Sequence, residues 1–361
     1  MRSDESPCRR SMTANSDAPS RKNSMALTFG ISFAPNHPKE VADWCRAAED
    51  CGFERVGLVD SQSIYRELYV SCTAGLLASK RITIGPRVTN ALTRHPTVTA
   101  SALVTMAELA PGRVFAGVGT GDSALINIGL KPIKLATLAE FVNSIRGLMR
   151  GEKVHYQGSE FQLTWSGIAM PIYVSAHGPK TLEFSGQHAD GVIYGDGVGK
   201  EIVADALSAV SRGAANAGRN VRDVDIWWGL CGNVGNSRQE ALSQIRMLLA
   251  AKANHLARFP EQNKHVPPEF REVLDRIHQG YSYLEHQKPG ELTTNARLVS
   301  ESGLEDYLAG RYAIAGTPEE CLARLSELGK MGVQKIWLNV HFDDKIGFMK
   351  RWSRDVMAKI K

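Results

Sequence analysis

From Met25 onward, the sequence alternates short runs rich in β-branched residues with longer segments of helical periodicity, and it does so about eight times. Runs of the first kind predict strands, and apolar residues that recur every three or four positions predict helices. Strands that alternate with helices pair in parallel through right-handed crossovers. The predicted strands are 27–34, 54–60, 82–88, 114–119, 171–176, 191–195, 224–234 and 335–340. The predicted helices include 65–79, 96–109 and 318–330.

The number of repeats favours a closed sheet. Eight units can form a (β/α)8 barrel, whereas a doubly wound sheet more often stops at about five to seven strands and carries a glycine-rich fingerprint after its first strand. Here the first strand leads into Ala34-Pro35-Asn36-His37, with no GxGxxG. We therefore predict an α/β fold of the TIM-barrel type.

Two segments fall outside the repeat. Residues 1–24 are polar and rich in Ser, Arg and Asp, which predicts a disordered N-terminal tail. The stretch from about 255 to 310 is too long for a barrel loop and has helical pieces of its own. We expect a single barrel domain over 25–361, with that stretch inserted between units 7 and 8.

Composition excludes several classes of protein. The formal net charge is only +5 with no basic stripe, which argues against nucleic-acid binding. No apolar run is long enough to span a membrane, and the six scattered cysteines are typical of a reduced, cytoplasmic protein. No His/Cys cluster has metal-ligand spacing, so no metal site is predicted. Four histidines of the insertion are expected at the surface, with the third and fourth as alternative pocket residues: His255, His265, His278 and His286.

The loops that leave the carboxyl ends of the strands are polar and rich in glycine, and in a barrel they form the active-site face. Asp60 follows the second strand, Gly119-Thr120-Gly121-Asp122 ends the fourth, and Ser175 to Thr181 follow the fifth. Taken singly, Asp60 and Asp122 could be helix caps and Arg94 a solvated charge. Their shared position at one rim favours a functional site.

The segment from Ser175 to Thr181 runs from a strand into a helix that begins at Pro179. Free backbone amides and the positive end of the helix dipole suit a phosphate there, and Gly178 allows a ligand to approach closely. His177 could act as a base. The alternative is an ordinary turn whose histidine is satisfied by its neighbours.

Three segments together resemble the luciferase-like oxidoreductase superfamily: GPRVTNALTRHPTVTASALVTMAELAPGRVFAGVGTGDSAL (85–125), PIYVSAHGPKTLEFSGQHADGVIYG (171–195) and RYAIAGTPEECLARLSELGKMGVQKI (311–336). This superfamily includes bacterial luciferase, the two-component flavin monooxygenases and the deazaflavin F420-dependent reductases. The resemblance covers about residues 26–345. It implies a (β/α)8 barrel with an insertion, a homodimer, and FMN or F420 bound at the mouth of the barrel.

The resemblance also implies which residues bind the cofactor. The phosphate would lie at Ala176, His177, Gly178 and Thr181. The ring would lie against Val88, Thr89 and Asn90, with Gly119, Thr120 and Asp122 at a neighbouring edge. A non-prolyl cis peptide, common in the family after the third strand, would fall at Arg87-Val88.

For function, we expect a monooxygenase that uses reduced FMN and O2 to oxygenate a small organic substrate. A separate flavin reductase would supply the reduced FMN. The alternative is an F420-dependent reductase or dehydrogenase, and a third possibility is a flavin-binding protein without catalysis. The candidate catalytic residues are Asp60, Asp122 and His177. Methanopterin reductases have Asp-His at the end of the second strand, whereas this chain has Asp60-Ser61, so a histidine near the ring is missing.

Overall fold

The computed structural model describes residues 27–259, 262 and 264–360. The predicted disordered tail, residues 1–24, lies outside this range. Among the described helices, none is both long enough and apolar enough to cross a membrane.

A parallel sheet forms the centre of the molecule. Its order is β3-β2-β1-β12-β10-β9-β8-β5-β4. Strand β4 follows β3 after only two residues, so the sheet closes almost completely on itself. An isolated bridge between Ile84 and Val114 joins the region of β3 to the start of β5. The predicted TIM barrel is therefore confirmed. Its strands are β1 (Thr28–Phe33), β2 (Arg55–Leu58), β3 (Thr83–Pro86), β4 (Thr89–Asn90), β5 (Ala116–Gly119), β8 (Ile172–Ala176), β9 (Gly191–Tyr194), β10 (Asp225–Val234) and β12 (Lys335–Asn339).

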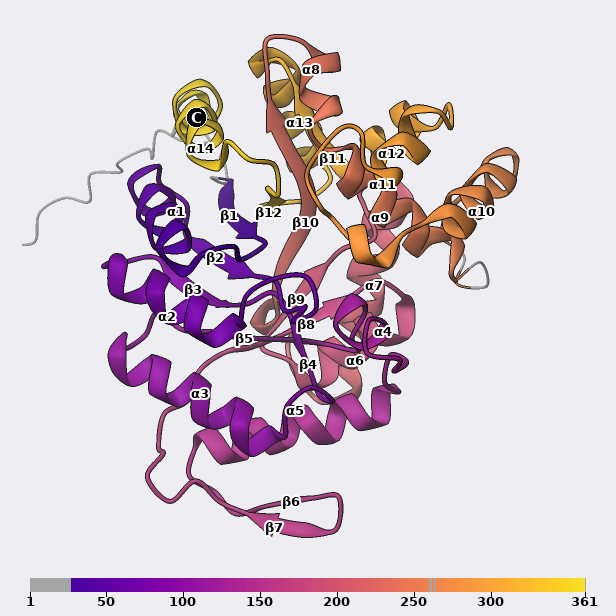
Figure 1. The fold of residues 1–361 in the computed structure, drawn as a ribbon. Coiled ribbons are helices and arrows are strands. Elements are labelled where there is room, and N and C mark those ends of the chain that lie inside the picture. The colour runs from indigo at the N-terminus through magenta and orange to yellow at the C-terminus, as the bar shows by residue number, and fades with distance from the viewer. Residues whose placement is uncertain (1–26, 260–261, 263, 361) are drawn as a thin grey trace, which may run out of the picture.

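Helices surround this sheet, and Figure 1 shows them following the strands in turn. They are α1 (Pro38–Asp50), α2 (Leu68–Ala78), α3 (Pro96–Leu109), α5 (Leu135–Met149), α6 (Pro179–His188), α7 (Lys200–Asn216), α13 (Pro318–Lys330) and α14 (Lys345–Asp355). Several begin with proline because its fixed φ suits the first helical turn. In α13, Thr317 and Glu320 also form a capping box, which satisfies free amides at the start of the helix. A hairpin, β6 (Val154–Tyr156) and β7 (Ser159–Phe161), projects from the barrel between α5 and β8.

The segment between β10 and α13 folds as a group of helices on one side of the barrel (Figure 1). It contains α8 (Arg238–Ser243), α9 (Arg246–Ala257), α10 (Arg271–Gly280), α11 (Thr294–Ser300) and α12 (Glu305–Tyr312). It ends in a short strand, β11 (Ala313–Gly316), which pairs in parallel with the end of β10. Strand β11 was not predicted from the sequence, because Ala-Ile-Ala-Gly is short and has only one β-branched residue.

An aromatic layer fills the inside of the barrel. Phe115, Tyr173, Trp227 and Trp337 are almost completely buried there, together with Ile193. The ring of Trp337 contacts those of Phe115 and Trp227 at centroid distances of 5.4 and 5.2 Å. This layer fills the inside of the barrel below the carboxyl ends of the strands. A ligand therefore reaches the barrel from the side on which those carboxyl ends lie.

Candidate active site

A cavity of about 240 Å³ lies at the carboxyl ends of the strands. Eight of the sequence-predicted site residues line it: Asp60, Val88, Thr89, Asn90, Gly119, Thr120, Asp122 and His177. The other three, Ala176, Gly178 and Thr181, do not line it but flank His177 at the end of β8 and the start of α6. A second cavity, of about 320 Å³, shares His177 with the first and extends along α6 and α7.

The bulge between β3 and β4 forms one wall of the first cavity. The peptide bond between Arg87 and Val88 is cis, as the resemblance to the family implied. A Cβ atom at Gly119 would lie 2.9 Å from a methyl group of Val88. Glycine on β5 is therefore needed for the bulge to pack this closely, which explains one of the glycines in the Gly117–Gly121 segment.

Asp60 lies beneath this bulge and is only 8% exposed. Its Oδ2 accepts hydrogen bonds from the Thr89 hydroxyl and from Nη1 of Arg94, each at 2.7 Å. Arg94 also donates to Glu67 at 2.9 Å and stacks over the ring of Tyr69. The simple interpretations of Asp60 as a helix cap and of Arg94 as a solvated charge are therefore wrong, because the two side chains form a largely buried ion pair.

Asp122 occupies the N-cap position of the short helix α4 (Ser123–Ile126), yet its side chain makes no capping hydrogen bond. Its carboxylate instead binds Nη1 of Arg258, the residue that ends α9, at 2.7 Å. This ion pair ties the loop after β5 to the helix that covers the mouth. The carboxylate remains 41% exposed and lies at the cavity wall.

Ser61 follows Asp60 at the end of β2. Its hydroxyl shares a hydrogen bond of 3.0 Å with the hydroxyl of Ser123, and both side chains are buried. The next residue, Gln62, donates to the carbonyl of Ala124 at 2.8 Å. The end of β2 is thus joined to α4 by neutral hydrogen bonds, and no proton-transfer group lies at this position.

His177 lies between the two cavities. Its ring packs on Gly195, where a Cβ atom would lie 2.5 Å from Cε1, and stacks obliquely with the ring of His255 at 4.2 Å. Its Nδ1 is buried without a hydrogen-bond partner. Burial, followed by the charges of Lys252 and Lys264, lowers the pKa of His177 well below its usual value, so the imidazole is neutral at pH 7.

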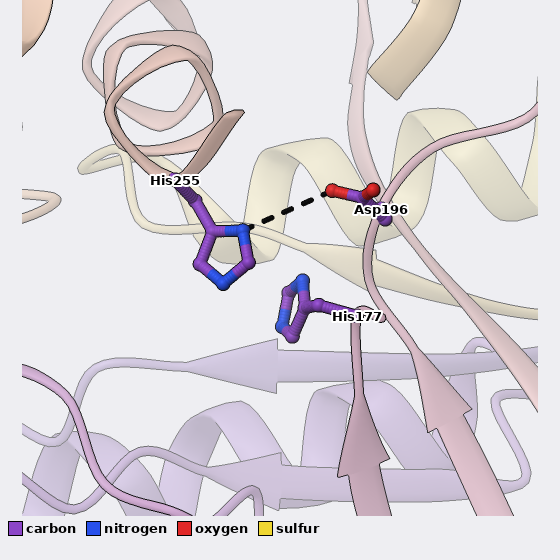
Figure 2. A group of neighbouring side chains, drawn as sticks. All are labelled: His177, Asp196 and His255. Carbon is purple, nitrogen blue, oxygen red and sulfur yellow. Dashed lines mark ion pairs between the residues drawn. The ribbon is translucent and has the colours of Figure 1, made fainter. Parts of the chain in front are cut away.

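Figure 2 shows His177, His255 and Asp196 facing one another. Their potential ligand atoms lie within 4.8 Å of one another, which raises the question of a metal ion. The Asp196 carboxylate, however, already pairs with Lys264 and Arg311, each at 3.6 Å. A divalent cation here would be repelled by both basic side chains, so the surroundings suit an anion better than a metal.

The start of α6 adjoins this basic cluster. Gly178 is the N-cap of the helix, no side chain caps it, and Pro179 follows. The helix therefore directs free backbone amides and its positive dipole end toward the region of the second cavity. Lys264 and Arg311 line the same cavity. That this turn binds a phosphate stays a prediction.

Five basic residues that line the cavity were not among the predicted site residues: Arg87, Lys252, His255, Arg258 and His286. The prediction that His255 lies at the surface is wrong, and for His286 the alternative, a pocket residue, is the one that the structure supports. Nδ1 of His286 shares a hydrogen bond of 2.7 Å with the Tyr281 hydroxyl. A signal for α9 was present, because polar residues at every third position interrupt an otherwise apolar helix at Lys252, His255 and Arg258. The other two predicted surface histidines hydrogen-bond within the protein, His265 to Asp205 and His278 to Asn254.

Comparison with known proteins identifies the family. The luciferase-like monooxygenase family matches residues 12–335. A 5,10-methylenetetrahydromethanopterin reductase of Methanolobus tindarius is 29% identical over 320 residues, which cover 86% of this chain and 93% of the relative. An F420-dependent glucose-6-phosphate dehydrogenase of Nakamurella multipartita is 26% identical over 344 residues, which cover 90% of this chain and 93% of the relative.

Solved structures share the fold. The F420-dependent tetrahydromethanopterin reductase of Methanopyrus kandleri superposes with a TM-score of 0.73 at 23% identity, covering 93% of this chain and 100% of that one. A long-chain alkane monooxygenase gives 0.63 at 15%, covering 93% and 91%. The prediction of a luciferase-like oxidoreductase is confirmed by the match over most of the chain, and this protein belongs to the luciferase-like monooxygenase family.

Proposed function

We propose that this protein is an F420-dependent reductase or dehydrogenase, which transfers a hydride between the deazaflavin and a small organic substrate. The relatives that match over most of their length are named as F420-dependent dehydrogenases or as methylenetetrahydromethanopterin reductases. The monooxygenases among the similar structures are more distant, at 15 to 17% identity. The balance therefore moves from the predicted FMN monooxygenase to its alternative.

The observation that carries this proposal is the charge of the cavity wall. Asp122, Lys252 and Arg258 line the cavity, as do Arg87 and Asp60. A flavin monooxygenase must protect a reactive oxygen adduct from water, which an apolar and dry cavity does best. Charged side chains retain water at the wall. Hydride transfer needs close positioning of donor and acceptor but no such protection from water.

The residues around the two cavities fit an elongated cofactor with one ring system and one phosphate. The ring would lie against Val88, Thr89 and Asn90 of the bulge, with Gly119 and Thr120 at its edge. The phosphate would lie at the start of α6, near Ala176, His177, Gly178 and Thr181. The uncapped start of α6 supports the proposal, because its free backbone amides can bind a phosphate.

When bound, F420 accepts or donates the hydride, and the side chains of this chain position it and move the accompanying proton. Asp122 is the proposed proton-transfer group, because its carboxylate lies at the cavity wall and is partly exposed. Asp60 holds Thr89 and Arg94 in place. His177 is proposed to contact the cofactor as a neutral hydrogen-bonding group rather than as a base, because burial and the charges of Lys252 and Lys264 disfavour its protonated form.

The deciding experiment is a titration of the protein with F420 and, under anaerobic conditions, with reduced FMN. We expect F420 to bind with micromolar or better affinity. Tight binding of reduced FMN without binding of F420 would replace this proposal with the monooxygenase, which needs a flavin reductase. If the protein binds neither F420 nor reduced FMN, both the hydride-transfer proposal and the monooxygenase are overturned.

A substrate screen with the bound cofactor follows. The names of similar proteins suggest three starting compounds: methylenetetrahydromethanopterin, glucose 6-phosphate and a secondary alcohol. Reduction or oxidation of F420 is followed by its absorbance, with oxygen consumption as the parallel measurement. Substrate-dependent oxygen consumption would favour the monooxygenase. Cofactor turnover without oxygen consumption would favour hydride transfer.

A further inference from the structure

Two arginines lie on opposite sides of the aromatic layer inside the barrel. Arg55 lies over the rings of Tyr173 and Trp227, at 4.9 Å from each centroid. Arg87 lies over the ring of Trp337 at 5.3 Å. Because Trp227 and Trp337 touch each other, the two guanidinium groups are separated by a single layer of aromatic side chains.

The two arginines differ in their partners. Arg55 lies 3.4 Å from the Asp225 carboxylate and 3.3 Å from Glu54. Arg87 makes no ion pair or hydrogen bond through its side chain with any described residue, and its Nε is buried without a partner. Arg87 nevertheless lines the first cavity. Its guanidinium is therefore a positive charge that the protein leaves without an acid, on the side where ligands enter.

The barrel makes room for this guanidinium. A Cβ atom at Gly229 on β10 would lie 2.5 Å from Nη2 of Arg87, and one at Gly57 on β2 would lie 2.5 Å from its Cβ. Glycines on two other strands thus let the Arg87 side chain extend across the barrel from the end of β3. Burial lowers the pKa of Arg87 to about 10, which leaves the group charged at pH 7.

A second cation without an acid partner lies beside it. Lys252, on α9, donates from Nζ to the carbonyl of Gly195 at 2.8 Å and makes no ion pair with a described residue. Arg87 and Lys252 act on the same buried groups, since the charges of both, after the effect of burial, lower the pKa values of His177 and His341. The inner end of the cavity therefore carries two positive charges.

Unpaired buried cations are unfavourable, because they lose the hydration that water would give them. An anionic ligand removes this cost when it binds. A guanidinium offers two parallel N–H donors, which match a delocalised anion of the form N–C–O⁻. Arg87 also directly precedes Val88, the residue on which the ring is proposed to lie.

We propose that Arg87 and Lys252 form a binding site for the negative charge that the cofactor ring acquires on reduction, at its N1–C2–O edge. This inference rests on the proposed function. A hydride would bring two electrons and one proton to the ring, which would gain one negative charge, and the substrate would lose the same hydride. Arg87 and Lys252 neutralise that charge without accepting or donating a proton, and they favour the reduced cofactor over the oxidised one.

The test compares the dissociation constants of oxidised and reduced F420, measured anaerobically, in the wild type, Arg87→Met and Lys252→Met. We expect Arg87→Met to weaken binding of the reduced form about tenfold more than that of the oxidised form, as for loss of a charged hydrogen bond. Arg87→Lys should restore part of the preference. The matched control is Arg55→Met, which removes a positive charge from the other side of the aromatic layer and should leave the ratio unchanged.

Three results would overturn the inference. An equal loss of both forms in Arg87→Met and Lys252→Met would mean that the two cations hold the phosphate. An unchanged ratio in both variants would mean that they do not act on the ring. Binding of inorganic phosphate or benzoate to the cofactor-free wild type, lost in Arg87→Met, would assign the site to an anionic substrate.

Failure of the proposed function gives a different result, because the wild type would then bind FMN instead of F420. The same ratio is in that case measured with oxidised and reduced FMN. Circular dichroism confirms that each variant is folded. If Arg87→Met does not fold, the Lys252→Met variant, whose side chain comes from α9 rather than from the barrel, carries the test.

Discussion

Asp60 and Arg94 form a largely buried ion pair at the rim of the barrel, with Oδ2 of Asp60 accepting from Nη1 of Arg94 at 2.7 Å. The Asp60 side chain is only 2% exposed, and the same oxygen also accepts from the Thr89 hydroxyl. A carboxylate with two donors and almost no exposure is a poor proton-transfer group, because its lone pairs are already used. Its geometry fits a positioning residue for the bulge that carries Thr89.

Asp60→Ala should therefore act first on stability. Removal of the carboxylate leaves the Arg94 guanidinium with only the exposed Glu67, and we expect a loss of about 2 to 4 kcal/mol in the free energy of unfolding. Cofactor affinity should fall with it, since Thr89 loses its acceptor. Urea denaturation measures the first effect and cofactor titration the second. The control is Glu67→Gln, which removes the outer partner and should cost less than about 1 kcal/mol. Normal stability and affinity in Asp60→Ala, with turnover abolished, would restore Asp60 as a catalytic acid or base.

Asp122 should show the opposite pattern. Asp122→Asn keeps the shape of the side chain but removes its capacity to move a proton, and we expect turnover to fall by a factor of about 10² to 10⁴. Cofactor affinity and stability should change little, because the ion pair with Arg258 is partly exposed and worth less than about 1 kcal/mol. Single-turnover kinetics measures the hydride step. Arg258→Gln is the matched control, since it breaks the same pair and leaves the carboxylate. Equal turnover in Asp122→Asn and the wild type would remove Asp122 from the mechanism.

The fold could be predicted largely from the sequence because its information is local. Helix α3 covers 96–109 and α13 covers 318–330, as the periodicity predicted, and each begins with proline after a side-chain cap. Helix α2 begins at Leu68 rather than 65, because Glu67 caps it by accepting from the amide of Val70. The strands β1 and β12 are adjacent although they lie at opposite ends of the chain. Closure of the barrel brings them together, and the count of eight units predicts that closure.

Only the part of the site that lies at the ends of the strands could be predicted from the sequence. The loops after the strands supply Asp60, Thr89 and Asp122, and the rule that the mouth of a barrel carries the chemistry was enough to find them. Arg258 meets Asp122 across 136 positions of sequence. Contacts of that kind depend on how α9 docks on the barrel, which no periodic pattern encodes. Lys252 lies on the same helix and was missed for the same reason.

The outer faces of α2 and α3 support the predicted homodimer. Val70 and Leu77 on α2 are 58% and 68% exposed, and Val98 and Leu109 on α3 are 54% and 52% exposed. The two helices are neighbours in the fold, so these side chains expose apolar surface on one side of the barrel. We expect a dimer through this surface, which Leu77→Glu combined with Leu109→Glu should convert to a monomer in light scattering. Leu292→Glu, at an exposed position in the helical segment after β10, is the control and should stay dimeric. A monomeric wild type would contradict the prediction.

His341 should make the protein sensitive to acid. It is 2% exposed, and both ring nitrogens lack a partner among the described residues. Burial first, and then the charges of Lys345 and Arg87, lower the pKa of His341 well below its usual value. Below about pH 6.5 the unfolded chain binds a proton at this residue that the folded protein does not, so stability falls as the pH falls.

The slope contributed by His341 is about 1.4 kcal/mol per pH unit, from about pH 6.5 down to its folded pKa. We expect His341→Leu to remove that slope from a series of urea denaturations at different pH values. Above pH 7.5 the imidazole of His341 is neutral in the folded and in the unfolded wild type. There the variant should be at least as stable as the wild type, because leucine buries no unpaired nitrogen. His155→Leu, at a side chain that is 80% exposed, is the control and should keep the slope. If His341→Leu keeps the full acid dependence, protonation of another buried group must account for it. Burial also lowers the pKa values of three other histidines, which are the next to replace: His177, His255 and His286.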